Sequence, residues 1–225
     1  MVPIRKTPLI NNEVYHVYNR SISFTPAFVS KRDYQRTLEI LNYYQFAKTP
    51  LSFSKFKKVS TKERAKLLEK LNKENNHLAK ILCFCLMPNH FHLLLKQTKE
   101  NGISKLVANL QNSYTRYFNL KNKRLGPLFQ GAFKAIRIET EEQLVHVSRY
   151  IHLNPYSSLV IKTLGEIKEY TWSSFREYLH PSKNQICFSK EILNFFKNPK
   201  EYKNFVLDQA NYQKEIEKIK HLVLE

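Results

Sequence analysis

The sequence is poor in cysteine, glycine and acidic residues, and it contains no long hydrophobic run. Three cysteines, an odd and low number, argue against a disulfide framework and for a reducing compartment. Four glycines and nine prolines argue against a linker or low-complexity chain. No stretch reaches the roughly 18 apolar residues of a membrane span, and the first residues lack the apolar core of a secretory signal. We therefore expect a cytoplasmic protein without a membrane partner.

Acidic residues are outnumbered by basic ones almost two to one. The chain has 19 Asp and Glu against 37 Lys and Arg, a net charge of +18. A field of this sign attracts polyanions. Aromatic residues make up 13% of the chain, and although most belong in a core, exposed rings can stack on unpaired bases. Composition therefore favours a nucleic-acid partner, with a lysine-rich soluble protein as the alternative.

Hydrophobic periodicity predicts an α+β fold. Strands are expected over residues 13–19, 78–87, 90–97 and 133–139, and helices over residues 33–46, 104–120 and 141–154. We expect Asp33 and Thr140 to cap their helices, Thr140 in a capping box with Gln143. The last helix should end before Pro155, because the residue before a proline disfavours helical geometry.

The order βαββαβ is that of a ferredoxin-like arrangement, an antiparallel sheet with helices on one face. The helix over residues 141–154 is extra to that scaffold. Residues 48–76 are interpreted as a surface insertion with one helix over residues 61–72. Residues 8–180 are expected to form the main domain, and residues 181–225 a C-terminal helical appendage that docks on DNA or on the extra helix.

Two histidines flank one phenylalanine in the strand over residues 90–97. Side chains alternate across a strand, so His90 and His92 lie on one face and Phe91 points into the core. Two imidazoles on one face can share a divalent metal ion. A half-exposed strand explains the pattern equally well. If the turn at 88–89 closes a two-residue hairpin, Cys85 lies opposite His92, and a structural zinc site that includes Cys83 is a further alternative.

Tyr150 and Asn154 share one face of the helix over residues 141–154, because they are four residues apart. A tyrosine beside a metal ion can attack a phosphodiester, and the amide oxygen of Asn154 could be a third ligand. The alternative is a core tyrosine and a helix C-cap. Tyr114 and Tyr117 are rival nucleophiles, but neither has a ligand-type side chain four residues later, and a role in the core explains both.

The run LMPNHFHLL (residues 86–94) resembles the HUH motif of the insertion-sequence transposases that use a single tyrosine. YIHLNP (150–155) resembles their catalytic-helix signature, and SYTRYFN (113–119) and GPLFQG (126–131) also match. YHVYNR (15–20) and WSS (172–174) are similar to the branch known as REP-associated tyrosine transposases. The resemblance covers about residues 8 to 180.

This resemblance implies an HUH-type DNA nicking and joining enzyme that acts on single-stranded or hairpin DNA. His90, His92 and Asn154 would be metal ligands for Mg²⁺ or Mn²⁺, and Tyr150 would form a covalent 5′-phosphotyrosine. No nucleotide cofactor is expected, because the sequence contains no phosphate-binding loop motif. Monomeric and homodimeric forms both remain open. Basic residues near the motifs are expected to contact DNA phosphates as a group: Arg20, Arg116, Lys121, Lys123, Arg124, Lys134 and Arg137.

Two other functions fit parts of the sequence. A non-catalytic nucleic-acid-binding module on a ferredoxin-like fold fits the charge and the aromatic content, but it leaves the two histidines and Tyr-x-x-x-Asn unexplained. A metal-dependent hydrolase would use the same metal site with water as the nucleophile, and it would not need Tyr150.

Overall fold

The computed structural model describes residues 8–182 and 185–223, with the side chains of residues 218–223 left out. It contains four strands and a series of helices. In chain order these are β1 (Val14–Arg20), η1 (Ile22–Phe24), α1 (Lys31–Tyr44), α2 (Phe53–Phe56), α3 (Thr61–Glu74), β2 (Ala79–Met87), β3 (His90–Gln97), α4 (Gly102–Lys121), β4 (Lys134–Ile138), α5 (Glu141–Ser157), η2 (Leu164–Lys168), α6 (Phe175–Leu179), α7 (Lys190–Leu193), α8 (Pro199–Asp208) and α9 (Ala210–Val223).

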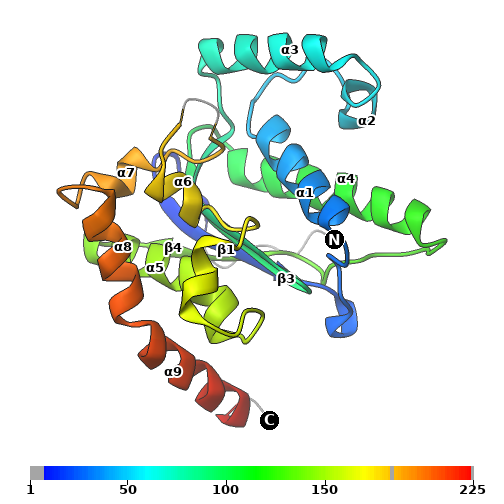
Figure 1. Cartoon of the computed structure of the whole chain (residues 1–225). Helices are drawn as coiled ribbons and strands as arrows, with labels where there is room; N and C mark the ends of the chain where they lie inside the picture. Colours follow the sequence, from blue (N-terminus) through cyan, green and yellow to red (C-terminus); the bar gives the residue numbers. More distant parts are fainter. Residues whose placement is uncertain (1–7, 183–184, 224–225) are drawn as a thin grey trace.

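The four strands form one antiparallel sheet in the order β2-β3-β1-β4. This order, with α1 and α4 as the two connecting helices, confirms the ferredoxin-like arrangement (Figure 1). The hairpin between β2 and β3 places Cys85 opposite His92, as expected from a two-residue turn. No described helix is long and apolar enough to cross a membrane.

Helices cover both faces of the sheet (Figure 1). Helices α1 and α4 pack on one face, around buried side chains that include Tyr15, Phe91 and Leu93. Helix α5 lies on the other face, where Cys83 and Leu94 join residues of α6 and α8 in a second core. The C-terminal segment therefore docks on α5, one of the two positions expected for it. Its buried residues, such as Tyr202, belong to this second core.

The start of α1 and the end of α5 differ from their predicted positions for identifiable reasons. Helix α1 begins earlier than expected, because Ser30 is the N-cap and Asp33 is its partner in a capping box. Helix α5 continues to Ser157 with Pro155 inside its last turn, and the Ser158 amide still donates to the Asn154 carbonyl. A proline there removes one hydrogen bond near the end of the helix, where the helix can continue for two more residues. At the other end, Thr140 accepts from the Gln143 amide as expected, but the Gln143 side chain accepts from the Glu139 amide and not from that of Thr140, so the predicted capping box is incomplete.

The segment over residues 48–76 contains α2 in addition to the expected helix. Helix α3 is largely exposed, as predicted for a surface insertion, and only Leu71 of its residues is buried. Phe53 and Phe56 of α2, however, are buried in the core beneath α1, so this part of the segment contributes to the fold.

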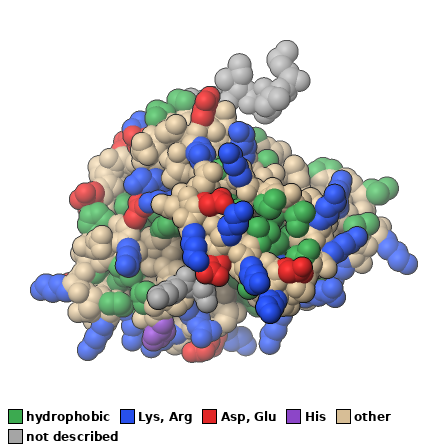
Figure 2. All heavy atoms as spheres, turned by 90° about the horizontal axis from the view of Figure 1, so that it is seen from above, with side chains coloured by type: hydrophobic (Ala, Val, Ile, Leu, Met, Phe, Trp, Pro, Cys, Tyr) green, Lys and Arg blue, Asp and Glu red, His purple; other side chains and the backbone are tan. Residues whose placement is uncertain are grey.

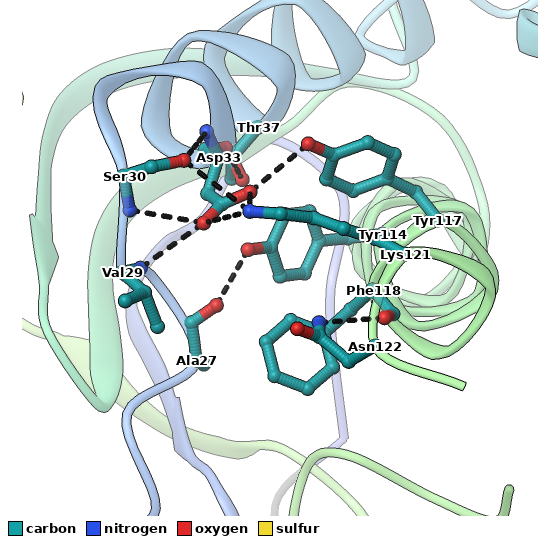
Figure 3. Close-up of polar contacts among 10 residues, drawn as sticks. All are labelled: Ala27, Val29, Ser30, Asp33, Thr37, Tyr114, Tyr117, Phe118, Lys121 and Asn122. Atoms are coloured by element: carbon teal, nitrogen blue, oxygen red, sulfur yellow. Dashed lines mark hydrogen bonds and ion pairs between the residues drawn. The ribbon is translucent and has the colours of Figure 1, made fainter. Parts of the chain in front are cut away.

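Asp33 links the N-terminus of α1 to the C-terminus of α4 (Figure 3). Its side chain is fully buried. Lys121 Nζ donates to both carboxylate oxygens at 2.7 and 2.9 Å, and the Tyr117 hydroxyl donates at 3.0 Å. Burial by itself would raise the pKa of Asp33, but the hydrogen bonds from Lys121, Ser30 and Tyr117 outweigh it and lower the pKa.

We expect Asp33→Asn to lower the free energy of unfolding by about 2 kcal/mol at pH 7, since several hydrogen bonds to a charged group are lost. The folded-state pKa of Asp33 is depressed, so its contribution is present above the ordinary carboxyl pKa and is lost as the pH falls through the folded value. When the pH falls through the folded-state pKa of Asp33, the free energy of unfolding should therefore decrease less in the variant than in the wild type. Urea denaturation at pH 7 and at acidic pH measures both effects.

The matched control is Glu69→Gln, which breaks the exposed pair between Glu69 and Lys73 on α3. Exposed pairs contribute little, so this variant should unfold at the wild-type urea concentration. Equal stability of Asp33→Asn and the control would show that the buried cluster does not stabilise the packing of α1 on α4.

Candidate active site between the sheet and helix α5

His90 and His92 project from β3 toward α5, while Phe91 between them is buried in the core on the other face. The two imidazole rings are perpendicular, with centroids 5.0 Å apart. Nδ1 of His90 lies 2.6 Å from Oδ1 of Asn89 in the hairpin turn. The alternation expected for a strand is thus present, and it brings both rings to one end of the sheet.

A third histidine, on β1, belongs to the same group. His16 Nε2 lies 2.9 Å from His92 Nδ1, and the two buried rings are stacked with an interplanar angle of 23°. The ring of Tyr18, also on β1, is 5.8 Å from that of His92. When His92 Nδ1 donates to His16 Nε2, the tautomer of His92 is the one that carries its lone pair on Nε2.

Tyr150 and Asn154 reach this group from α5. The ring of Tyr150 meets that of His92 edge-on, with a centroid distance of 5.6 Å. The Asn154 side chain, which is 1% exposed, lies within hydrogen-bonding reach of both the His90 ring and the Tyr150 hydroxyl. The structure therefore brings together the four residues that the sequence singled out for chemistry.

Burial favours the neutral forms of His90 and Tyr150. It lowers the pKa of His90 to about 4, with a further lowering by the charge of Arg20 and an opposing effect of the hydrogen bond to Asn154. Burial also raises the pKa of Tyr150 to about 12, and the negative charge of Glu217 on α9 adds to this. At neutral pH both groups are uncharged, so His90 has a lone pair to offer and Tyr150 retains its proton.

The donor set fits a hard or borderline divalent cation. Two imidazoles and one amide oxygen converge here, and three protein ligands leave coordination positions open for water or substrate oxygen. Among the described residues, no group of three or more His, Cys, Asp or Glu side chains could hold a metal ion. A metal ion at this site would therefore need the amide oxygen of Asn154.

Cys83 and Cys85 do not form a zinc site with the histidines. All described cysteines are free and buried. Cys83 Sγ lies 3.1 Å from Nε2 of His152 and within 3.5 Å of the Ser174 hydroxyl. Burial raises the pKa of both thiols, which keeps them protonated. The structure explains these cysteines as members of the core beneath α5.

His152 is the functional neighbour that the sequence analysis missed. It is fully buried on α5, between Tyr150 and Asn154 along the chain. Its Nδ1 lies 2.7 Å from the Tyr202 hydroxyl of α8, and its Nε2 lies 2.8 Å from the Ser174 hydroxyl. Because these bonds fix the rotation of α5 about its axis, they position Tyr150 and Asn154. The signal available in the sequence was the position of His152 between two apolar residues in the run YIHLNP (150–155).

The rival tyrosines have structural partners on the other face of the sheet. The Tyr114 hydroxyl donates to the Ala27 carbonyl, and the Tyr117 hydroxyl donates to Asp33 (Figure 3). Neither ring is in contact with the histidine group.

The predicted DNA-contacting residues fall into two sets. Arg20 and Lys134 are exposed beside the histidine group, where Lys134 Nζ lies 6.0 Å from the Tyr18 ring centroid. Four others belong to α4 or to the loop that follows it: Arg116, Lys121, Lys123 and Arg124. Arg137 lies on neither surface and forms an ion pair with Glu13 at 2.9 Å.

Tyr202→Phe tests the role of the hydrogen bonds at His152. The variant leaves His152 Nδ1 and the Ser148 hydroxyl without the Tyr202 oxygen, so we expect the free energy of unfolding to fall by about 1–3 kcal/mol. Tyr212→Phe is the control, because its side chain is 65% exposed. Urea denaturation compares the two, and identical midpoints would mean that the buried hydroxyl does not hold α5.

Part of the chain is similar to a known family. Residues 52–154, which include His90, His92, Tyr150 and Asn154, match the family model described as IS200-like transposase.

A solved structure of a REP-associated tyrosine transposase bound to a REP hairpin has the same fold. The TM-score is 0.54 at 13% sequence identity, over 84% of this chain and 92% of that chain. The human outer kinetochore KNL1 complex subunit KNL1 is 30% identical over 105 residues, which are 45% of this chain but 4% of that protein. That overlap is too small a part of the human protein to carry its activity over. Residues 52–154 of this chain are thus similar to the IS200-like transposase family.

Proposed function

We propose that this protein is a metal-dependent enzyme that nicks and rejoins single-stranded DNA through a covalent 5′-phosphotyrosine on Tyr150, with hairpin DNA as its substrate. The observation that carries the proposal is the convergence of Tyr150 and Asn154 on the His90–His92 pair. The net charge of +18 and the transposase family support a DNA substrate, and the hairpin bound by the similar structure suggests its form.

His90, His92 and Asn154 are the residues that would hold Mg²⁺ or Mn²⁺. Such an ion supplies positive charge that polarises a phosphodiester and stabilises the charge developing during its attack. Asn89 holds the His90 ring in place at Nδ1 of His90, and His16 holds the His92 ring in place at Nδ1 of His92. Arg20 and Lys134 add positive charge at the rim of the site, where it attracts the phosphate backbone.

Tyr150 is the nucleophile in this proposal. Its hydroxyl oxygen forms a bond to the scissile phosphorus and loses its proton, while the bond from phosphorus to the 3′ oxygen breaks and that oxygen leaves as a hydroxyl after taking up a proton. One phosphate ester replaces another, so the step is reversible and needs no nucleotide cofactor. Because the pKa of Tyr150 is raised, its deprotonation would be favoured by positive charge near the phenol oxygen, such as a divalent cation held by the neighbouring ligands would supply.

Tyr150→Phe tests the mechanism. The protein is incubated with Mn²⁺ and end-labelled hairpin-bearing single strands, and the products are separated on a denaturing gel. We expect wild-type protein to give a labelled protein–DNA adduct that Tyr150→Phe abolishes, because phenylalanine lacks the phenol oxygen that bonds to the phosphorus. Tyr156→Phe on the same helix, whose hydroxyl contacts Asn211, is the control and should keep the adduct.

Each other outcome contradicts a part of the proposal. Cutting without an adduct, retained in Tyr150→Phe, would identify water as the nucleophile and the protein as a hydrolase. Hairpin binding with neither cutting nor adduct would favour a non-catalytic binding module.

His16→Ala tests the metal site without relying on turnover. A ligand histidine depends on the partner of its second ring nitrogen, and loss of such a partner typically weakens metal binding about 10–100-fold. We expect His16→Ala to weaken Mn²⁺ binding in calorimetry to this extent and His16→Gln, which retains an acceptor, to recover part of it. The control is His146→Ala on the exposed side of α5. Unchanged Mn²⁺ affinity in His16→Ala would remove His92 from the ligand set.

A further inference from the structure

Phe24 is an exposed aromatic residue at the end of the sheet that carries the candidate active site. It belongs to η1, the turn that follows β1 and lies beyond the end of that strand (Figure 1). Among the described residues, only Phe24 and Phe195 are exposed phenylalanines, and Phe24 is the more exposed of the two at 60%. A single exposed ring is ordinary on a protein surface, so the surroundings of Phe24 decide whether it has a role.

The backbone at Phe24 has an unfavourable conformation. Ser23 and Phe24 both have positive φ angles, of 53° and 54°, in a region that bulky side chains rarely adopt. The segment is tied to the turn between β2 and β3 on both sides, because the Ser21 and Ala27 amides each donate to a carbonyl of that turn at 2.8 Å. Residues in such conformations persist where the surrounding structure enforces them, often at sites that bind ligands. Here the enforced conformation presents an aromatic ring to solvent.

One side chain joins this segment to the histidine group. Asn89 Nδ2 donates to the Phe24 carbonyl at 3.3 Å, and Oδ1 of the same side chain lies 2.6 Å from Nδ1 of His90. Both ends of the Asn89 amide are therefore used, which couples the position of η1 to the orientation of the His90 ring. Only this amide group separates the Phe24 backbone from a proposed metal ligand.

Arg20 covers one face of the Phe24 ring. Its guanidinium carbon lies 4.7 Å from the ring centroid, which is a cation–π contact. Arg20 is also opposite His90 in the register of β1 with β3, so the contact orients the ring beside the histidine group. Because 60% of Phe24 is exposed, the other face of its ring is open to solvent.

An open ring face beside positive charge suits an unpaired nucleobase. Every base has a flat π-face, and proteins that hold single strands stack such bases on aromatic side chains. Arg20 and Lys134 supply charge that attracts a phosphate backbone, and Lys and Arg side chains are more frequent than Asp and Glu over the face seen in Figure 2. An apolar protein partner fits less well, because Ser23 and Thr25 on either side of Phe24 are polar and exposed.

We propose that Phe24 is a stacking residue of the DNA reaction: one unpaired base lies on the open face of its ring, opposite Arg20. The base, the Phe24 ring and the Arg20 guanidinium would then form one stack at the edge of the candidate active site. A base held there restricts the rotation of the phosphate beside it, which helps to orient that phosphate for attack. The contact is made to the face of a base and not to its edge, so it is tolerant of sequence. This inference rests on the proposed function for the identity of the substrate.

The test uses hairpin DNA with an unpaired flank, in which 2-aminopurine replaces one flank base at a time. The emission of this fluorescent base changes when it stacks. Binding is measured with Mg²⁺ in the full-length protein carrying Tyr150→Phe, so that the proposed chemistry cannot occur. We expect the emission at a particular flank position to change on binding. The further substitution Phe24→Leu should abolish this change, and Phe24→Trp, which keeps a flat aromatic ring, should retain it.

Affinity provides a second readout, by fluorescence anisotropy of an end label on the same DNA. Phe24→Leu should weaken binding of the flanked hairpin about tenfold, the contribution of one stacked base. Affinity for the same hairpin without its flank should stay within about twofold, less than one stacked base contributes. The matched control is Phe195→Leu, which removes the other exposed phenylalanine, after α7, and should change neither readout. Thermal melting verifies that all variants are folded.

Several results would overturn the proposal. They are an emission change that survives Phe24→Leu or occurs at no flank position, equal weakening of both hairpins, loss of the change in Phe24→Trp, and equal effects of the control. The stacking role and the chemistry also fail separately. A wild-type adduct that depends on Tyr150, with unaltered flank emission in Phe24→Leu, would remove the stacking role and leave the mechanism in place. Loss of the emission change in Phe24→Leu, in a protein that forms no adduct, would do the reverse.

Discussion

Helix α5 buries polar side chains against an apolar face of the sheet. The hydrogen bonds of these side chains determine the position of Tyr150, the candidate nucleophile. Ser148 and His152 are fully buried, and both bond to the hydroxyl of Tyr202. A buried polar group without a partner costs about 1–3 kcal/mol, so turning α5 to another face would break several bonds at once. The helix therefore has one favourable rotation, and in that rotation Tyr150 and Asn154 face the histidines of β3.

His90 is uncharged at neutral pH inside a strongly basic protein. If His90, His92 and Asn154 hold a divalent cation as proposed, these three ligands include no carboxylate, so the cation would gain no attraction from an opposite charge among them until a phosphate arrives. The phosphate, in contrast, is attracted from a distance by the charges of Arg20 and Lys134. This distribution of charge would make metal and DNA bind with mutual support, because each supplies the countercharge that the other lacks.

Much of the site followed from local sequence patterns. Alternation along β3 placed His90 and His92 on one face, and the spacing of four placed Asn154 beside Tyr150. The partner of His92 did not follow, because His16 reaches it only through the register of β1 with β3, which joins residues 76 positions apart. The position of the C-terminal helices was left open for the same reason, since their polar anchors, such as Tyr202, contact α5 over long sequence separations. At Pro155 a local rule failed, because one missing hydrogen bond in a last turn is a small cost against tertiary packing.

The edge of β2 has a consequence for the order in which the molecule can form. Residues 170–174 bond to this edge, where the Leu86 amide donates to the Trp172 carbonyl, and Phe188 bonds to Ile81 further along the strand. The segments that close this edge and lock α5 are thus synthesised after every strand of the sheet. A chain still emerging from the ribosome would have its α1–α4 layer available early, while the apolar face beneath α5 waits for α6 and α8. The positions of Tyr150 and Asn154 beside the histidines would then be fixed only after α8 has been synthesised.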